Sequence, residues 1–275
     1  MAEAVDRKLL GSLLVMGSVV EARDAYTGGH LWRVSRFARL LAEEMGADQN
    51  AVFLAAIGGF LHDFGKIGIP DSILNKPEPL TEAEIGVIRT HPAIGRSIIG
   101  EHPLGDLVMD AIAHHHERMD GDGYPDRLAG SGIPLVARIV AICDAFDAMT
   151  STRPYRPAVD IDGAFRLLDE AAGSQFDNAL VTVFHAVRRS GKLAHVVGHS
   201  HHHHRLAICP HCGSVVAIHH IGAGEVAACR VCGTEFRKLS EDGGGLEATG
   251  RSGTPEQLRP MPDFAPIREL VQLAP

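Results

Sequence analysis

Apolar positions in the first 190 residues recur at the spacing of α-helices. In the segment 9–20 the apolar residues Leu9, Leu13, Met16 and Val20 fall three or four positions apart, which places them on one helical face. Residues 51–61 are almost wholly apolar, as expected for a helix buried on most sides. Further helices are predicted over 31–41, 85–88, 107–116, 135–149 and 164–187, with a stop at Gly46 and a capping box at Thr81 and Glu84. The pattern therefore predicts an all-α helical bundle.

The pattern changes after Gly191. A His-rich stretch over 191–205 is typical of a linker, and the Val-, Ile- and Cys-rich residues that follow predict a small β module. The Gly- and Pro-rich remainder predicts a flexible tail, in which 264–273 has the pattern of one short amphipathic helix. The predicted domains are the helical domain 1–190, the His-rich linker 191–205, the β module 206–240 and the flexible tail 241–275.

Composition and charge disfavour some classes of function. With 275 residues, a net charge of −8 and 45% hydrophobic residues, the chain can bury a substantial core but repels phosphate polymers, so general nucleic-acid binding is disfavoured. The apolar segment 9–20 is too short to span a membrane and lacks a basic leader. We predict a cytoplasmic protein without a membrane span, in which this segment could support a homodimer.

Histidines and aspartates are unusually placed in the helical part, which contains eight of the 17 His. His62 and Asp63 end the apolar helix, and adjacent helical side chains diverge by about 100°. One imidazole can thus face one metal ion while the carboxylate bridges to a second, and Lys66 is suited to a phosphate oxygen. Asp144 and Asp147 lie in an otherwise apolar helix, where a carboxylate is costly unless paired or metal-bound.

These ligand types favour two ions of the iron, manganese, zinc or nickel class over calcium or magnesium. Two such ions can generate a hydroxide and hold the oxygens of a phosphodiester. Any single histidine here could instead be structural, and the triplet His114 to His116 could be a solvated helix end. The remaining histidine candidates are His30 and His91.

A series of motifs in one order resembles the HD-GYP domain, a subgroup of the HD phosphohydrolases. The resemblance covers about residues 20–185. Its motifs are Thr27-Gly28-Gly29-His30 with Arg33-Val34, His62-Asp63-Phe64-Gly65-Lys66-Ile67-Gly68-Ile69-Pro70, Thr90-His91-Pro92, His115-His116-Glu117-Arg118, Gly121-Asp122-Gly123-Tyr124-Pro125, Asp144-Ala145-Phe146-Asp147-Ala148-Met149-Thr150 and Arg153-Pro154-Tyr155-Arg156.

The resemblance implies an all-α enzyme that hydrolyses cyclic di-GMP to pGpG or GMP at an iron or manganese centre. It implies that Asp63 bridges the metals, that Lys66 contacts the scissile phosphate, and that Arg153 and Arg156 contact the rest of the substrate. The metal ligands that it implies are His30, His62, Asp63, His91, His115, His116 and Asp144.

One position departs from the family pattern. Members with a third metal resemble a pattern with Glu four residues before the first histidine, where this chain has Tyr26. We therefore expect two metals, with pGpG as the product and GMP in doubt. The loop Gly123-Tyr124-Pro125 is explained by a tight turn, and the resemblance adds a second interpretation, a surface for a GGDEF-type cyclase domain.

The β module carries two Cys-x-x-Cys pairs, Cys209 with Cys212 and Cys229 with Cys232, separated by 16 residues. Four thiolates complete a tetrahedral site, so we predict one structural zinc ion in a zinc ribbon. A disulfide pair is the alternative, which a reducing compartment disfavours. The ribbon has few basic and aromatic residues, so a structural or protein-binding role is favoured over nucleic acid.

Two other functions stay open at this point. The first is a receptor that binds a cyclic dinucleotide or a cyclase without hydrolysis. The second is hydrolysis of another cyclic dinucleotide, because the base is recognised by pocket walls that the sequence does not resolve.

Overall fold

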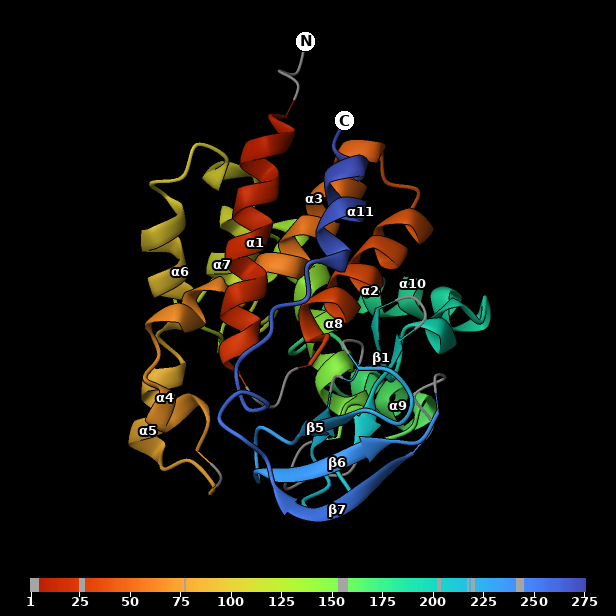
Figure 1. Ribbon diagram of the computed structural model, residues 1–275. Coiled ribbons are helices and arrows are strands. Elements are labelled where there is room, and N and C mark those ends of the chain that lie inside the picture. The colour runs from red at the N-terminus through yellow and green to blue at the C-terminus, as the bar shows by residue number, and fades with distance from the viewer. Residues whose placement is uncertain are drawn as a thin grey trace.

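A computed structural model of the chain describes residues 5–24, 28–76, 78–152, 158–201, 204–216, 218, 221–240 and 245–275 (Figure 1). Its helical part contains α1 (Arg7–Arg23), α2 (His30–Glu44), α3 (Gln49–Leu61), α4 (Asp71–Leu74), α5 (Glu82–Ile88), α6 (His91–Ile99), α7 (Met109–His114), α8 (Leu135–Thr150), α9 (Ile161–Ala171) and α10 (Asn178–Arg189). Short 3-10 turns occur at η1 (Phe64–Gly68), η2 (Gly105–Leu107), η3 (Gly130–Gly132) and η4 (Lys192–His195). The predicted all-α bundle with a small β module is confirmed.

The core has two apolar clusters that meet along α2 and α3. One contains the aromatic rings of Phe37, Phe146, Phe165 and Phe184 from α2, α8, α9 and α10, with Phe146 and Phe184 edge to face at 5.1 Å. The other joins α1, α3 and α7. Large buried aromatic and aliphatic side chains dominate the energetics of such cores, so this part of the protein is a rigid scaffold.

Local signals explain the start of α5 and the break between α9 and α10. Thr81 and Glu84 form the predicted capping box at the start of α5. The predicted helical region 164–187 is divided into α9 and α10 by a turn at Gly173, whose φ of +81° favours glycine. The stretch Gln49–Gly68 has the length and hydropathy of a membrane span, but 67% of it is buried inside the protein, as is usual for a core helix.

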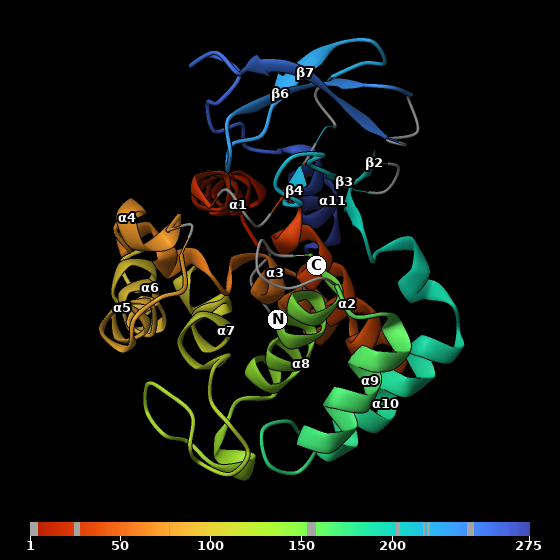
Figure 2. The same cartoon turned by 90° about the horizontal axis from the view of Figure 1, so that it is seen from below.

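Short antiparallel strands form the C-terminal part (Figure 2). The hairpins pair β1 (His199–His201) with β2 (His204–Arg205) and β3 (Ala207–Ile208) with β4 (Val215–Val216). A three-stranded sheet follows in the order β5 (Val226–Ala228), β6 (Thr234–Lys238) and β7 (Leu246–Ser252). Part of the predicted linker is therefore a strand, which lies against α2.

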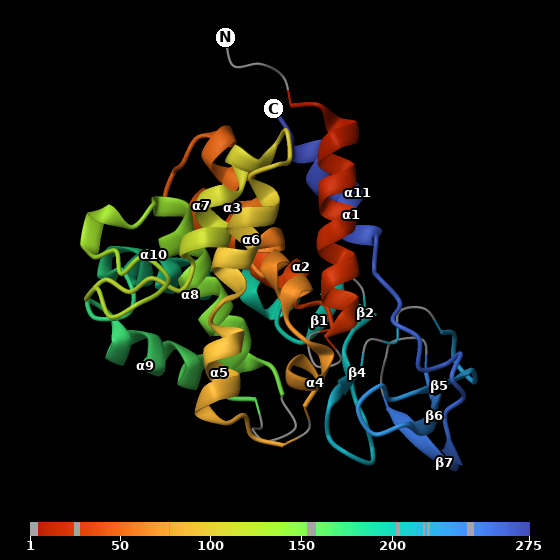
Figure 3. The same ribbon diagram turned by 90° about the vertical axis from the view of Figure 1, so that its left-hand side faces the viewer.

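The region predicted as a flexible tail is largely folded. Strand β7 pairs with β6, and α11 (Ala265–Leu273) packs beside α1 with Ile267 and Leu270 buried in the second apolar cluster (Figure 3). Arg36 and Arg39 of α2 both bind Glu269, at 2.5 and 3.3 Å. The chain thus leaves the helical part, forms the β module and returns to α1. The apolar face of α11 is buried there against the second apolar cluster.

Candidate metal centre

The predicted ligands of the helical part converge at one place. His30 begins α2, His62 and Asp63 follow α3, His91 begins α6, His115 and His116 follow α7, and Asp144 lies inside α8. Between α3 and α6 the backbone must approach closely, since a Cβ on Gly65 would lie 1.8 Å from the carbonyl oxygen of His91. Only glycine fits at that position, and it allows the turn η1 to bring Lys66 beside the histidines.

Four of these imidazoles are held from behind through Nδ1. The Nδ1 atoms of His62, His91 and His115 donate to the backbone carbonyls of Gly59, Ile88 and Ala111 at 2.8, 2.8 and 2.9 Å. That of His30 donates to the carboxylate of Asp147 at 2.8 Å. Such hydrogen bonds fix the tautomer and leave the lone pair of Nε2 for a metal.

The free Nε2 atoms face one another at short distance. His30 Nε2 lies 3.3 Å from His62 Nε2, and His91 Nε2 lies 3.2 Å from His115 Nε2. Two lone pairs this close repel unless a cation lies between or beside them. This arrangement of neutral nitrogen donors therefore fits transition-metal ions.

The carboxylate of Asp63 lies between two groups of histidines. Its Oδ2 is 3.5 Å from His30 Nε2 and 3.4 Å from His62 Nε2, while its Oδ1 is 3.4 Å from His91 Nε2. Asp144 Oδ1 is 3.5 Å from His30 Nε2. Within each of two groups the ligand atoms lie within 4.8 Å of one another, and these groups are His30 with His62 and Asp144, and His91 with His115 and His116.

The electrostatics divide the site into neutral and charged groups. Burial holds the pKa of His91 below its usual value, that of His115 well below it, and that of His116 at about 4, so these rings are neutral ligands at neutral pH. Burial opposes charge on His30 too, but the hydrogen bonds to Asp147 and Asp63 raise its pKa to about 10. The carboxylates around His30 thus stabilise a positive charge at its imidazole, which either a proton or a bound metal ion can supply.

Three supporting residues were not among the predicted site residues. Asp147 accepts from His30 and from Arg33, whose Nε and Nη2 donate to its two oxygens at 2.6 and 3.0 Å. Arg33 is 2% exposed and also donates to the carbonyl of His199 in β1, at 2.9 Å. Asp24 Oδ2 lies 3.6 Å from Lys66 Nζ. The signal for Asp147 was its place one turn after Asp144, and Arg33 belonged to the first motif of the family resemblance, although no role was predicted for it.

Lys66 lies at the edge of the centre, with Nζ 2.8 Å from Asp63 Oδ2. Burial opposes its charge, yet Asp63 and Asp24 raise its pKa above the usual value. The predicted substrate contacts Arg153 and Arg156, and the departure at Tyr26, lie outside the described residues. The ammonium group of Lys66 thus places a positive charge, paired with Asp63, at the edge of the centre.

A cavity of about 840 Å³ opens beside the centre and is large enough for a small ligand. The loop Gly123-Tyr124-Pro125 forms part of its wall, and the ring of Tyr124 stacks on His116 with a centroid distance of 4.8 Å. A Cβ on Gly123 would lie 2.5 Å from backbone atoms of Glu117 and Arg118, so a close approach requires glycine there. The turn geometry expected for this loop thus places it beside the site.

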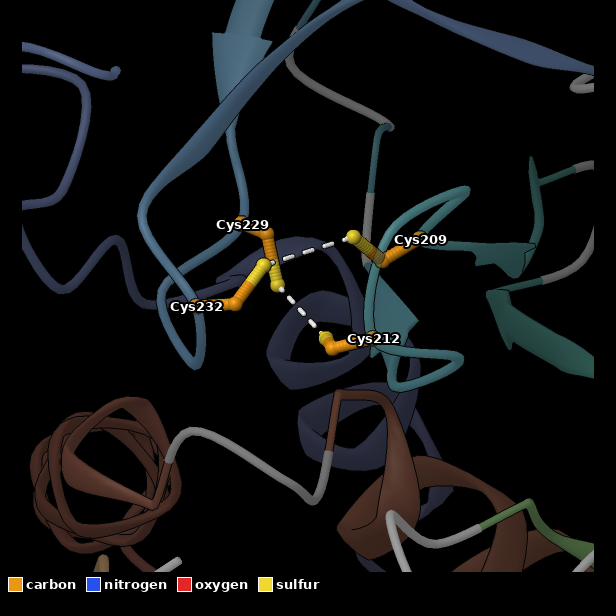
Figure 4. A group of neighbouring side chains, drawn as sticks. All are labelled: Cys209, Cys212, Cys229 and Cys232. Carbon is orange, nitrogen blue, oxygen red and sulfur yellow. Dashed lines mark hydrogen bonds between the residues drawn. The ribbon is translucent and has the colours of Figure 1, made fainter.

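The second cluster consists of the four predicted cysteines (Figure 4). Cys209 Sγ lies 3.7 Å from Cys232 Sγ, and Cys212 Sγ lies 3.7 Å from Cys229 Sγ. Tetrahedral zinc with Zn–S bonds of about 2.3 Å spaces its sulfurs by about 3.8 Å, whereas a disulfide needs about 2.05 Å. The four sulfurs thus have the spacing of a zinc site.

The two cysteine turns have the same backbone geometry. In the first, Gly213 N–H donates to the carbonyl of Cys209 at 3.0 Å, and in the second Gly233 N–H donates to Cys229 at 2.8 Å. The φ angles of the two glycines are +73° and +74°. Paired turns of this kind present two thiolates each, so the fit to one structural zinc is good.

Comparison with known proteins agrees with the helical site. The family model of the HD domain matches residues 15–180. The cyclic di-GMP phosphodiesterase response regulator RpfG of Xanthomonas campestris is 42% identical over 175 residues, which are 63% of this chain and 46% of the relative. A cyclic di-GMP phosphodiesterase of Vibrio cholerae is 39% identical, over 64% of this chain and 39% of the relative. The 3'3'-cGAMP-specific phosphodiesterase 3 of V. cholerae is 37% identical, over 58% and 35%.

Among solved structures, Bd1817, an HDG"Y"P protein from Bdellovibrio bacteriovorus, has the same fold with a TM-score of 0.50 at 20% identity, over 60% of this chain and 53% of that chain. The chain spans less than half the length of the three curated relatives. The resemblance expected from the motifs is confirmed at the level of the family, and the chain belongs to the HD-domain family.

Proposed function

We propose that the helical domain is a metal-dependent phosphodiesterase that hydrolyses cyclic di-GMP to pGpG. The observation that carries the proposal is the position of Asp63, whose two carboxylate oxygens face two separate groups of imidazoles. The curated relatives named cyclic di-GMP phosphodiesterases support the substrate. GMP as an onward product, a GGDEF-type partner at the Tyr124 loop, a homodimer and a cytoplasmic location stay predictions.

Two divalent transition metals, with iron or manganese favoured, would be held in two groups that share Asp63. The first group is His30, His62 and Asp144, and the second is His91, His115 and His116. When bound, such ions supply Lewis acidity to phosphate oxygens and lower the pKa of water. A separate structural zinc would be held by Cys209, Cys212, Cys229 and Cys232.

The chain's own residues bind and orient the substrate. Lys66 would donate to a nonbridging oxygen of the scissile phosphate, where its ammonium offsets the negative charge that develops during attack. Asp24 and Asp63 hold this ammonium at the edge of the centre. The Tyr124 ring, stacked on His116, forms part of the cavity wall beside the ligands.

The test combines metal analysis and product analysis on protein purified without oxygen. Mass spectrometry should find two iron or manganese ions and one zinc per chain, and chromatography of cyclic di-GMP incubations should find pGpG. Intact substrate after reconstitution with both iron and manganese would contradict the proposal, and stoichiometric binding without product would favour a receptor instead.

A second substrate is favoured by a specific observation. The V. cholerae relative that is 37% identical is named as specific for 3'3'-cGAMP, which has the same two phosphodiesters and one different base. The ratio of kcat/KM for cyclic di-GMP and 3'3'-cGAMP decides between the two substrates.

A further inference from the structure

The loop after Tyr124 contains a backbone conformation that its residue disfavours. Arg127 is the only non-glycine residue with positive φ in the described ranges, at 55°. In this left-handed region the Cβ of an L-residue crowds the backbone, so the conformation costs free energy. Such a residue persists only where its surroundings impose the conformation, often beside a functional site.

Glu117 imposes the conformation of Arg127. This side chain is buried, and its carboxylate accepts from the backbone N–H groups of Asp126 at 2.7 Å and Leu128 at 3.1 Å, which are the two neighbours of Arg127. Arg96 in turn binds the side chain of Asp126 at 2.6 Å. The loop therefore holds the backbone of Arg127 in a fixed place at the wall of the cavity.

The cavity that Arg127 lines also contains His115, His116 and Asp144 of the candidate centre. Among the residues that the structure describes, two other guanidinium groups line it, and both are engaged. Arg118 binds Asp120 at 2.5 and 3.0 Å, and Arg89 lies over the ring of Tyr124 at 5.7 Å from its centroid.

The guanidinium of Arg127 makes no hydrogen bond or ion pair within the part of the chain that the structure describes, and this residue is exposed and lines the cavity. The carboxylates of described residues that share the wall are Asp122 and Asp144, together with Glu117, which is bound to the loop backbone. A cation that makes no such contact there, on a backbone that Glu117 holds at the wall of the same cavity as the candidate centre, is suited to an anionic part of the ligand.

We propose that Arg127 is a specificity-determining residue. It binds the second phosphate of a cyclic dinucleotide while the first phosphate is hydrolysed. This inference rests on the proposed function of the same cavity. A cyclic dinucleotide has two phosphodiesters, and when one lies at Lys66 and the metal ligands, the other carries a full negative charge elsewhere in the cavity. The planar guanidinium can donate two parallel hydrogen bonds to it. The binding of a diester with a single phosphate should not depend on Arg127.

The test is Arg127→Gly, because glycine adopts the same φ without strain and the variant should melt at or above the temperature of the wild type. We expect KM for cyclic di-GMP to rise about tenfold with kcat within about twofold, as for loss of one charge-assisted hydrogen bond. Turnover of bis(p-nitrophenyl) phosphate, which has one phosphate, should not change. Arg127→Lys should retain part of the effect, since it keeps the charge and loses the fork.

Arg189→Ala is the matched control, since it removes the same charge from an exposed position at the end of α10 that does not line the cavity. An unchanged KM in Arg127→Gly, or an equal loss with bis(p-nitrophenyl) phosphate, would overturn the proposal. If the wild type hydrolyses 3'3'-cGAMP or cyclic di-AMP but not cyclic di-GMP, the proposed substrate fails, while a tenfold rise in KM for the nucleotide that is hydrolysed still supports Arg127.

Calorimetric titration with cyclic di-GMP gives a readout that needs no turnover. Binding that is about tenfold weaker in Arg127→Gly supports the proposal even if no product forms. Equal binding by the two proteins, or no binding of any cyclic dinucleotide by the wild type, contradicts it.

Discussion

The two candidate metal centres of this chain are built in opposite ways. The ligands of the helical centre run from His30 to Asp144 and are positioned by helices with a large apolar core. Those of the ribbon run only from Cys209 to Cys232, and the buried cluster around them is small and includes Cys209 and Cys229 themselves. A large core can hold ligands in place without the metal, whereas a small one depends on the metal to fold.

The sharpest test of this contrast is Cys229→Ser, which replaces a buried thiolate of the ribbon. We expect loss of zinc and of the amide protection of β5 and β6, because structural zinc supplies on the order of 10 kcal/mol to such modules. The buried amides of α2 and α3 should keep their protection. Hydrogen exchange read by mass spectrometry, with zinc analysis, measures both.

Cys143→Ser is the control for this prediction, since Cys143 is buried in the helical core and far in sequence from the four-cysteine cluster. It should retain zinc. Retention of β5 and β6 protection in zinc-free Cys229→Ser would mean that the ribbon folds on its own apolar contacts, and the contrast would fail.

Asp63→Asn tests the opposite behaviour at the helical centre. The amide keeps the shape of the side chain but removes the charge that faces both imidazole groups, so we expect phosphodiesterase activity to fall by about a thousandfold or more. The helical fold should persist, because its apolar core and not the metal holds this part together, although loss of the ion pair with Lys66 lowers the melting temperature. Activity against cyclic di-GMP and differential scanning calorimetry are the two measurements, and a cooperative loss of the helical fold would contradict the expectation.

Arg33→Lys tests how far the helical centre depends on residues behind its ligands. The paired hydrogen bonds to Asp147 are lost, so we expect a destabilisation of about 3 kcal/mol and iron or manganese binding weaker by about 10- to 100-fold. Urea unfolding and metal titration give the two values. Arg188→Lys, whose partner Asp162 is 64% exposed, is the control and should change stability by less than about 1 kcal/mol.

The sequence was sufficient for what depends on local patterns. Helical periodicity and the order of the motifs led to the bundle and to the residues that converge around Asp63, and the two Cys-x-x-Cys pairs led to a cluster with the spacing of zinc. It was insufficient where the outcome depends on distant contacts. Ile267 and Leu270 near the C-terminus are buried in the same apolar cluster as α1. Arg33 donates hydrogen bonds both to Asp147 and to the carbonyl of His199. No local pattern in either segment specifies the partner.

The smallest expected effect concerns Glu21, which lies where α1 meets both parts of the molecule. Burial raises the pKa of its carboxyl to about 7 from a usual value of 4.5. The Leu31 backbone N–H, His30 and Arg33 oppose this rise, and the charge of Asp263 adds to it. The folded state therefore binds a proton more tightly than the unfolded state does. The contribution of Glu21 to stability is complete below about pH 4.5 and is lost as pH rises through 7.

Since each unit of pKa shift corresponds to about 1.36 kcal/mol, the loss of stability is at most about 3 kcal/mol. Glu21→Gln cannot ionise, so its urea unfolding free energy relative to wild type should increase between pH 5 and 8 by up to about this amount. A difference that stays constant with pH would show that this carboxyl is ionised at no cost, and that the junction between the two parts is open to water.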